Sequence, residues 1–259
     1  MTARPLSGCS VLVTRPAAQA DELSTAIEAA GGTAVRFPVL QILPRPVSEI
    51  RKDLADMPDP DIVIFVSRNA VDYGAPGFVG YTGDVAAVGR TTANRLAAAG
   101  LSVSIDPGEG FTSEQLLEHE KLQDLAGKSV LIVRGDDGRP RLGNVLSKRG
   151  AAVDYVHAYD RKTVEVPAAD IADLDRVWRA GDVDVVSVMS VATFEALVGL
   201  LPATTLLHLR QTPLVAPGER VIQTIGKLVP GIPAIQALGP HPDNIVSALI
   251  EWRRSGTSS

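Results

Sequence analysis

Three residues that can present hydrogen-bond donors to an anion follow directly after short apolar segments. They are Ser67 after 62–66, Gly89 after 85–88, and Ser190 after 185–189. Short apolar runs are typical of parallel strands buried on both faces, and a serine or glycine after one predicts a helix N-terminus. Helix N-termini favour anions, and ligands of open α/β sheets bind at the carboxyl ends of the strands. The pattern therefore predicts a site for an anionic ligand.

Four further side chains are candidates for the same site. Arg15, Arg134 and Arg139 follow the ends of predicted strands, and Tyr159 is an aromatic hydroxyl in an extended segment. The arginines would pair with anions, and Tyr159 would face an interdomain cleft, since its segment is a candidate linker and linkers face a cleft more often than other surface positions do. Each candidate also has a structural alternative: the arginines as solvated loop residues, Tyr159 as a packing residue, and the serines above as helix caps.

Other chemistries lack a matching pattern. The four histidines are scattered without a partner at metal-ligand spacing, so no metal site is predicted. Neither a Walker loop, a dinucleotide-binding glycine pattern nor a nucleophile elbow occurs. Cys9 has no neighbouring base and is not expected to be a nucleophile.

Composition indicates an ordinary globular protein of 259 residues, with 45% hydrophobic and 21% charged residues. One cysteine excludes a disulfide framework, and neither a signal-peptide pattern nor an apolar run of membrane-spanning length occurs. We therefore expect a cytoplasmic protein with no membrane contact. The net charge of −5 argues against a nucleic-acid surface.

The sequence contains an internal repeat. The segment 61–66 with Ser67 resembles 184–189 with Ser190, and 11–15 resembles 130–134. Both matches lie about 120 positions apart, so the chain is interpreted as a tandem duplication of a βαβ-rich half. Chance similarity between α/β units is the alternative.

Two extended, proline-containing segments are candidate linkers between α/β domains. They are 38–46 and 157–167. If they pair, the chain crosses twice between domains. The terminal domain would then combine 1–37 with 168–259, and the inserted middle domain would span 47–156.

Taken together, the motifs resemble those of the uroporphyrinogen-III synthase family. They are 13–23 with Arg15, 65–71 with Ser67 and Asn69, 87–93 with Gly89 and Thr92, 134–139 with Arg134 and Arg139, 156–159 with Tyr159, then Ser190 and 242–249. The resemblance covers nearly the whole chain. The loop 217–220 departs from the small hydroxyl residues of many members, which leaves its ligand contact open.

The resemblance implies two flavodoxin-like, parallel-sheet α/β domains joined by a two-stranded linker ladder, with a deep interdomain cleft. It also implies cyclisation of hydroxymethylbilane with inversion of ring D and loss of water, in tetrapyrrole (haem, sirohaem, cobalamin) biosynthesis. No metal or cofactor is implied. The implied substrate-binding residues are Arg15, Ser67, Asn69, Gly89, Thr92, Arg134, Arg139 and Ser190, and Tyr159 is the candidate proton donor.

For partners, we expect the bilane substrate, a monomeric state and a transient contact with the enzyme that precedes this one in the pathway. Two other classes stay open from the sequence. A two-domain cytosolic binding or regulatory module related to the family would lack catalysis. A transferase with twin Rossmann-like domains would place a nucleotide sugar in the same crevice.

Overall fold

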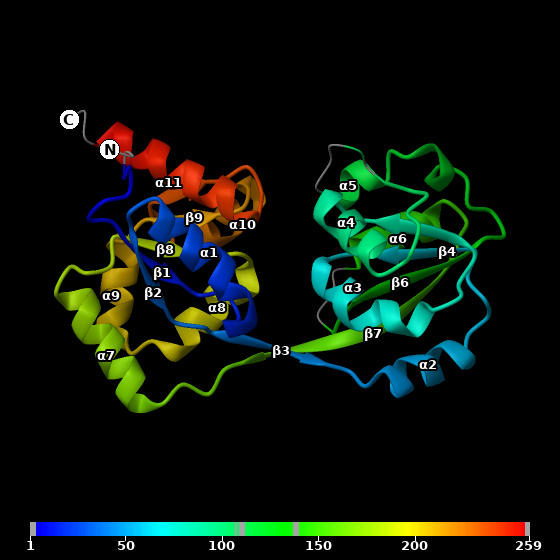
Figure 1. Cartoon of the computed structure of the whole chain (residues 1–259), viewed down its shortest axis with the longest axis horizontal. Coiled ribbons are helices and arrows are strands. Elements are labelled where there is room, and N and C mark those ends of the chain that lie inside the picture. The colour runs from blue at the N-terminus through cyan, green and yellow to red at the C-terminus, as the bar shows by residue number, and fades with distance from the viewer. Residues whose placement is uncertain (1–3, 107, 109–111, 137–139, 257–259) are drawn as a thin grey trace. The chain divides into compact units, whose positions relative to one another are not determined.

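The protein consists of two compact α/β units, as the resemblance implies (Figure 1). The computed structural model describes residues 4–106, 108, 112–136 and 140–256. The terminal unit combines Met1–Gln41 with Lys162–Ser259, and the middle unit is Ile42–Arg161. The two divisions fall within segments 38–46 and 157–167. That these segments form a linker ladder stays a prediction.

A five-stranded parallel sheet of spatial order β10-β9-β8-β1-β2 lies at the centre of the terminal unit. Its strands are β1 (Ser10–Val13), β2 (Thr33–Arg36), β8 (Val185–Ser187), β9 (Leu214–Ala216) and β10 (Ala234–Gln236). Numbered within the unit, this order is 2-1-3-4-5, which is that of flavodoxin. The chain reverses its direction across the sheet between β1 and β8, where doubly wound folds bind their ligands.

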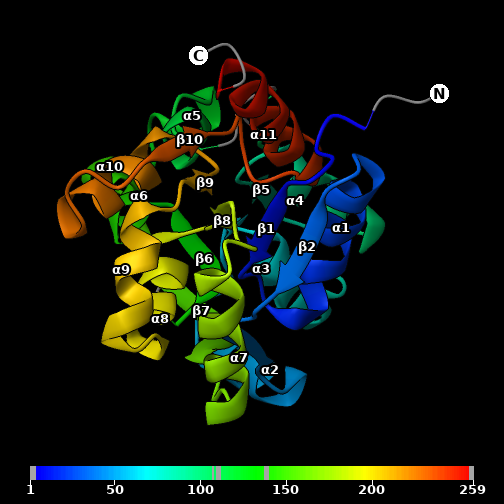
Figure 2. The ribbon, with the colours of Figure 1, turned by 90° about the vertical axis from the view of Figure 1, so that its left-hand side faces the viewer.

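Helices cover both faces of this sheet (Figure 2). They are α1 (Ala17–Ala29), α7 (Ala168–Arg179), α8 (Val191–Leu200), α9 (Ala203–Gln211), α10 (Glu219–Leu228) and α11 (Pro242–Gly256). Apolar residues of α1 and α11 bury one face, and those of α7 to α10 bury the other. Because β1 is covered on both sides, its Val11, Leu12 and Val13 are all 0% exposed, which explains the continuous apolar run.

The middle unit contains a second five-stranded sheet, of order β3-β7-β6-β4-β5. Its strands are β3 (Leu40–Pro44), β4 (Ile62–Phe65), β5 (Asp84–Ala87), β6 (Ser129–Gly135) and β7 (Ala152–Thr163). The α-helices are α2 (Val47–Ala55), α3 (Arg68–Gly74), α4 (Arg90–Ala98), α5 (Ser113–Leu116) and α6 (Arg141–Lys148), with 3-10 turns at η1 (Ala75–Phe78) and η2 (Glu120–Leu122). One face is packed by α2 to α4, and the other by α5, η2 and α6.

The two sheets share one strand order, as the predicted duplication requires. Strands β9-β8-β1-β2 correspond to β5-β4-β6-β7, and a parallel bridge at Ile105 beside β5 takes the place of β10. Each half of the sequence therefore contributes strands to both units. The first half supplies β1 to β5, and the second half supplies β6 to β10.

A carboxylate joins the same two strands at the same place in each unit. Asp61 accepts a hydrogen bond from the Ser129 backbone N–H at 2.8 Å, and Asp184 accepts one from the Ser10 backbone N–H at 2.7 Å. The backbone N–H of each aspartate returns a bond to the serine carbonyl. The strands that carry Ser67 and Ser190 are thus held in register with their central neighbours.

We expect Asp61→Asn to destabilise the protein mainly above pH 4. Bonds from the Ser129 backbone N–H and then from Lys128 lower the pKa of the Asp61 carboxyl. A lowered pKa in the folded state stabilises the protein above the unfolded value of about 3.9, and this stabilisation is lost as pH falls through the folded pKa. Urea midpoints of the variant and of the wild-type protein should therefore differ most at pH 6, and the difference should shrink as the pH falls below about 3.9. Asp59→Asn is the control, since Asp59 forms no ion pair among the described residues, and parallel curves for Asp61→Asn would contradict the assignment.

The second extended segment differs from its expectation. The sequence predicts a short strand at 153–156 directly before the linker 157–167. In the structure, β7 is instead one strand of 12 residues, paired with β6 from Ala152 to Tyr159. A register shift at Arg134/Gly135 lets the ladder continue, so Tyr159 lies opposite Gly135 inside the sheet. At the sheet edge, β3 runs antiparallel beside β7: the Arg45 N–H bonds to the Ala158 carbonyl, and the Val164 N–H to the Val39 carbonyl.

Smaller differences concern short elements. From the sequence, a capping box at 112–115 predicts a helix through about residue 125, but the structure has α5 of four residues followed by η2. The sequence also predicts a short strand at 101–105, where the structure has a single bridge. Helix α9 and strand β10 were not predicted at all. Among the described residues, none of the helices has the length and apolar character needed to cross a bilayer.

Candidate functional site

The candidate site of the middle unit lies at the carboxyl ends of its central strands. Ser67 follows β4 with extended backbone angles and caps α3, and its Oγ accepts a hydrogen bond from the Ala70 N–H at 3.2 Å. The Val88 N–H bonds to the Phe65 carbonyl at 3.0 Å, which brings the end of β5 beside the end of β4. The loops that carry Ser67 and Gly89 therefore share one edge of the sheet, as predicted.

Gly89 occupies a backbone conformation that explains its residue type. It precedes α4 with a φ of 85°, in the region that side chains other than glycine rarely adopt. No side chain caps this helix. Thr92 lies in the first turn of α4 and is 4% exposed, so its side chain packs inside the unit and presents little surface to a ligand.

Tyr159 lies inside the middle unit with its hydroxyl directed toward Ser67. Its side chain is 0% exposed and belongs to the apolar core, with its ring centroid 6.0 Å from that of Tyr73. The phenolic oxygen lies 3.3 Å from Ser67 Oγ. We expected Tyr159 to face a cleft from a linker; burial in the core corrects this expectation, because the continued pairing of β7 places it in the sheet.

Arg161 is a member of the site that the sequence did not suggest. Its Nη2 donates a hydrogen bond to Tyr159 Oη at 2.9 Å, and its backbone N–H donates to the Asp136 carboxylate at 3.2 Å. The available signal was a spacing of two along an extended segment, which places residues 159 and 161 on one face of a strand. The arginines selected from the sequence were only those that directly follow strand ends.

The remaining candidates of the middle unit differ in their surroundings. Asn69 lies in the first turn of α3 and is partly exposed. Arg134, at the end of β6, stacks its guanidinium 4.2 Å from the centroid of the Tyr155 ring, an arrangement that stabilises the cation. Arg139 lies outside the described residues. Binding roles for these residues stay predictions.

Arg15 and Ser190 belong to the terminal unit, at its switch between β1 and β8. Ser190 caps α8 as Ser67 caps α3: its Oγ accepts from the Thr193 N–H at 3.1 Å and lies 2.9 Å from Thr193 Oγ1. Arg15 is 7% exposed, and its Nη2 contacts the Pro240 carbonyl and lies 3.1 Å from Met189 Sδ. Arg15 therefore ties the loop before α11 to the end of β8.

We expect Arg15→Ala to act first on stability. Hydrogen bonds of a charged group contribute about 1.5–3 kcal/mol, and about 2 kcal/mol corresponds to a fall of roughly 5 °C in Tm for a protein of this size. Differential scanning calorimetry measures this change. A KM that rises a hundredfold at an unchanged Tm would instead identify Arg15 as a substrate anchor.

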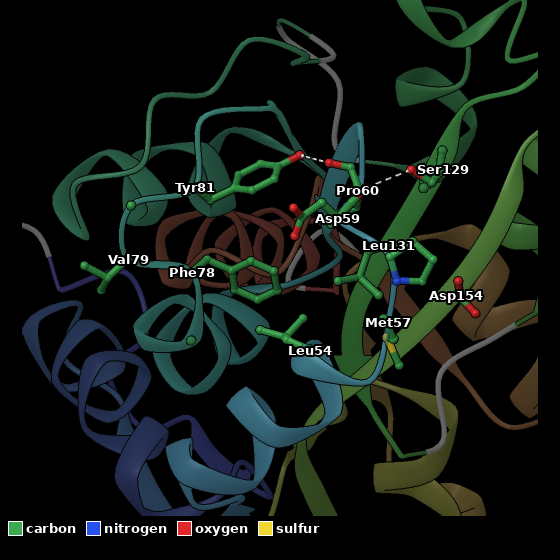
Figure 3. A pocket seen from close by; sticks show the side chains of 14 residues that line it. Leu54, Met57, Asp59, Pro60, Phe78, Val79, Tyr81, Ser129, Leu131 and Asp154 are labelled. Carbon is green, nitrogen blue, oxygen red and sulfur yellow. Dashed lines mark hydrogen bonds between the residues drawn. The ribbon is translucent and has the colours of Figure 1, made fainter.

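A hollow of about 260 Å³ lies near the amino ends of the middle strands, opposite to the ends that the candidate residues follow (Figure 3). Its lining comes from 57–60, from 77–81 and from the start of β6, whereas the candidate residues follow the strand ends. Burial, then the carboxylates of Asp84, Asp61 and Asp59, raises the pKa of Tyr81 to about 12. The phenol therefore keeps its proton and donates it to the Pro60 carbonyl at 2.9 Å, which holds the loop before β4 in place.

Cys9, which the sequence does not favour as a nucleophile, precedes the start of β1. Cys9 is 0% exposed, and burial and then Asp184 raise the pKa of its thiol, which disfavours the nucleophilic thiolate. Among the described residues, no cluster of three or more histidine, cysteine or carboxylate side chains has the arrangement to hold a metal ion.

The fold defines a two-unit α/β protein with flavodoxin-like sheets, in which polar loops follow the strand ends, where such folds bind ligands. A family model described as "Uroporphyrinogen-III synthase HemD" matches residues 21–246. Since this match spans most of the chain, the chain belongs to the uroporphyrinogen-III synthase family, whose members are cyclising lyases.

Relatives and solved structures agree with the family. A uroporphyrinogen-III synthase of Escherichia coli (strain K12) is 31% identical over 200 residues, covering 74% of this chain and 80% of the relative. A crystal structure of a mutant uroporphyrinogen III synthase from the extremely thermophilic bacterium Thermus thermophilus shares the fold, with a TM-score of 0.65 at 19% identity, covering 97% of this chain and 100% of that one. A uroporphyrinogen-III synthetase from Helicobacter pylori 26695 has a TM-score of 0.59 at 13% identity, covering 94% and 99%.

Proposed function

We propose that this protein converts hydroxymethylbilane, a linear tetrapyrrole, to uroporphyrinogen III. The substrate loses its hydroxyl group as water and closes to a macrocycle with ring D inverted. Membership of the family over most of the chain is the observation that carries this proposal. The hydroxyls of Ser67 and Tyr159, which meet at the carboxyl ends of the middle strands, support it with a proton source.

The main task of such an enzyme is control of geometry. The bilane closes unaided without inversion of ring D, so the catalyst must favour the closure that inverts it. Holding two reacting groups in one orientation accelerates a reaction without any strong acid or base. Departure of the hydroxyl needs a proton, and general acids contribute about 10²–10⁴-fold. The buried phenol and the serine at the strand ends suit this second task.

Helix ends are the proposed anchors for the eight carboxylates of the substrate. The chain has a net charge of −5, so its overall field does not attract an anion. Helices α4 and α8 begin at Gly89 and Ser190, at the strand ends. Each such end offers about half a positive charge and several backbone donors. These helix ends would hold the carboxylates locally. Ser67, Asn69 and three arginines would add side-chain contacts; the arginines are Arg15, Arg134 and Arg139.

The proposal includes a cytoplasmic monomer that meets the preceding enzyme of the pathway only transiently. A single buried cysteine suits a reducing compartment. The proposal also keeps the division expected from the sequence, with the terminal domain at 1–37 and 168–259, the middle domain at 47–156 and the linker ladder at 38–46 and 157–167.

One assay separates this function from the other two classes. Hydroxymethylbilane is incubated with the protein, absorbance is followed, and the product isomers are separated after oxidation. An excess of isomer III over the unaided reaction is expected. A binding module would yield only the unaided isomer while retaining affinity for a tetrapyrrole, and a transferase would act on a nucleotide sugar and leave the bilane unchanged.

A further inference from the structure

Three side chains of the middle unit form a continuous chain of hydrogen bonds that ends at the loop after β4. Arg161 Nη2 lies 2.9 Å from Tyr159 Oη, and Tyr159 Oη lies 3.3 Å from Ser67 Oγ. Tyr159 is 0% exposed, whereas Ser67 is partly exposed. Of the two hydroxyls, the one accessible to a ligand therefore belongs to Ser67.

The donors and acceptors fix the direction of this chain. A guanidinium only donates, so Tyr159 Oη accepts from Arg161. The Tyr159 hydroxyl then donates its proton to Ser67 Oγ, because a buried donor without an acceptor is energetically costly. Ser67 Oγ accepts this proton and the Ala70 N–H, which uses its two lone pairs. Its own proton is consequently free to point outward.

We propose that Ser67, and not Tyr159, delivers the proton to the departing hydroxyl of the substrate. Tyr159 replaces the proton of Ser67, and Arg161 is a positioning residue that orients the phenol and stabilises the negative charge that develops on it. This inference rests on the proposed function, and it adds Arg161 to the residues expected to affect catalysis.

The proton balance of this relay closes within one turnover. The C–O bond of the hydroxymethyl group breaks, and its electron pair leaves with the oxygen. That oxygen takes the Ser67 proton and becomes water, while Ser67 takes the proton of Tyr159. The pyrrole carbon that forms the new ring bond then loses a proton to Ser67 Oγ, and Ser67 passes its own proton back to the phenolate of Tyr159. Neither an oxidant nor a reductant takes part.

Comparison of the two serine caps supports a special role for Ser67. Within the described residues, Ser190 bonds only to the backbone and hydroxyl of Thr193, whereas Ser67 also meets a phenol backed by a guanidinium. The 3.3 Å separation is longer than the 2.7–2.8 Å of a good O–H···O bond. Catalytic hydrogen bonds often tighten only in the substrate complex, so this distance fits a relay at rest.

Serine variants test the outer end of the relay. Ser67→Ala should lower kcat about 100-fold, while KM rises less than about tenfold because the backbone donors of the helix remain. Ser67→Thr keeps the hydroxyl and should restore most of kcat. Ser190→Ala removes an equivalent cap, and its kcat should stay at least about tenfold higher than that of Ser67→Ala. Equal losses from the two alanine variants would overturn the relay.

Arginine variants test the inner end. Arg161→Ala should lower kcat at least about tenfold with little change in KM, and millimolar guanidinium should restore part of the lost kcat. Ammonium and urea at the same concentration are the controls, because neither offers a planar, charged pair of donors. A loss of kcat that guanidinium does not repair, or a loss confined to Tm, would assign Arg161 a structural role and overturn its place in the relay.

A measurement without substrate separates the relay from the proposed function. The chain has four tyrosines, so labelling with 4-¹³C-tyrosine gives four ¹³Cζ resonances, and Tyr159→Phe identifies that of Tyr159. Ser67→Ala and Arg161→Ala should each move this resonance, and Ser190→Ala should not. An unmoved resonance overturns the hydrogen-bond chain. If it moves but the wild-type protein makes no isomer III, the proposed function fails, and the catalytic part of the relay fails with it.

Discussion

Replacement of Tyr159 by phenylalanine is expected to lower kcat for isomer III by about 100-fold, the lower end of the range for a general acid. Phenylalanine keeps the ring that packs in the core but removes the hydroxyl between Ser67 and Arg161. KM should change little, because the buried ring presents no surface to the substrate. Steady-state kinetics with isomer separation provide both constants.

The matched control for this variant is Tyr155→Phe on the same strand. Its ring packs on the opposite face of the sheet, under the Arg134 guanidinium, so its hydroxyl lies away from the Ser67 loop. Loss of a phenol there should leave kcat within about twofold of the wild-type value. If the two variants retain the same kcat, the phenol of Tyr159 has no part in proton transfer.

Gly135→Ala is expected to impair both stability and turnover, because the added methyl group occupies space that the Tyr159 ring fills. A Cβ at this position would lie 2.7 Å from Cε2, 2.9 Å from Cζ and 3.2 Å from Oη of Tyr159. The ring must therefore shift and lose its aligned hydrogen bonds. Overpacking of this kind costs about 1–3 kcal/mol, and kcat should fall nearly as far as in Tyr159→Phe.

A double-mutant cycle tests this explanation. In a Tyr159→Phe background, Gly135→Ala should lower kcat little further, since the hydroxyl that it misplaces is already absent. Gly199→Ala in α8 is the control, because a Cβ there has no neighbouring atom within 4 Å. Additive losses of kcat in the cycle would show that Gly135 acts on the reaction by another route than Tyr159.

The central strands were predictable because burial on both faces forces an apolar run. β1, β4 and β6 show this run, and the serines that cap α3 and α8 follow from the need to satisfy free backbone donors. Strand β10 was not predictable in this way, since it has three residues, two of them exposed. Helix α9 lacks the strong apolar periodicity that reveals an amphipathic helix.

The geometry at Tyr159 could not be derived from the sequence for a different reason. Val156 and Ala158 face the core that contains α3, so simple alternation would point residue 159 away from it. The register shift at Arg134/Gly135 turns Tyr159 into that same core. Such irregularities carry no reliable local signal. Burial of Arg15 likewise depends on Met189 and Pro240, which are distant in sequence.

The nested chain order has a consequence for biosynthesis. The middle unit is continuous, so every strand partner within it exists once Arg161 has left the ribosome. Strand β1 of the terminal unit, by contrast, can pair with β8 only after most of the chain has been synthesised. The hydrogen bond between Ser10 and Asp184 spans 174 residues. Closing so long a loop is entropically costly, but pairing of Arg45 with Ala158 already brings the two ends of the inserted segment together. Folding of the insert first would thus shorten the effective loop that the terminal sheet must close, and β1 and β2 would depend on it kinetically.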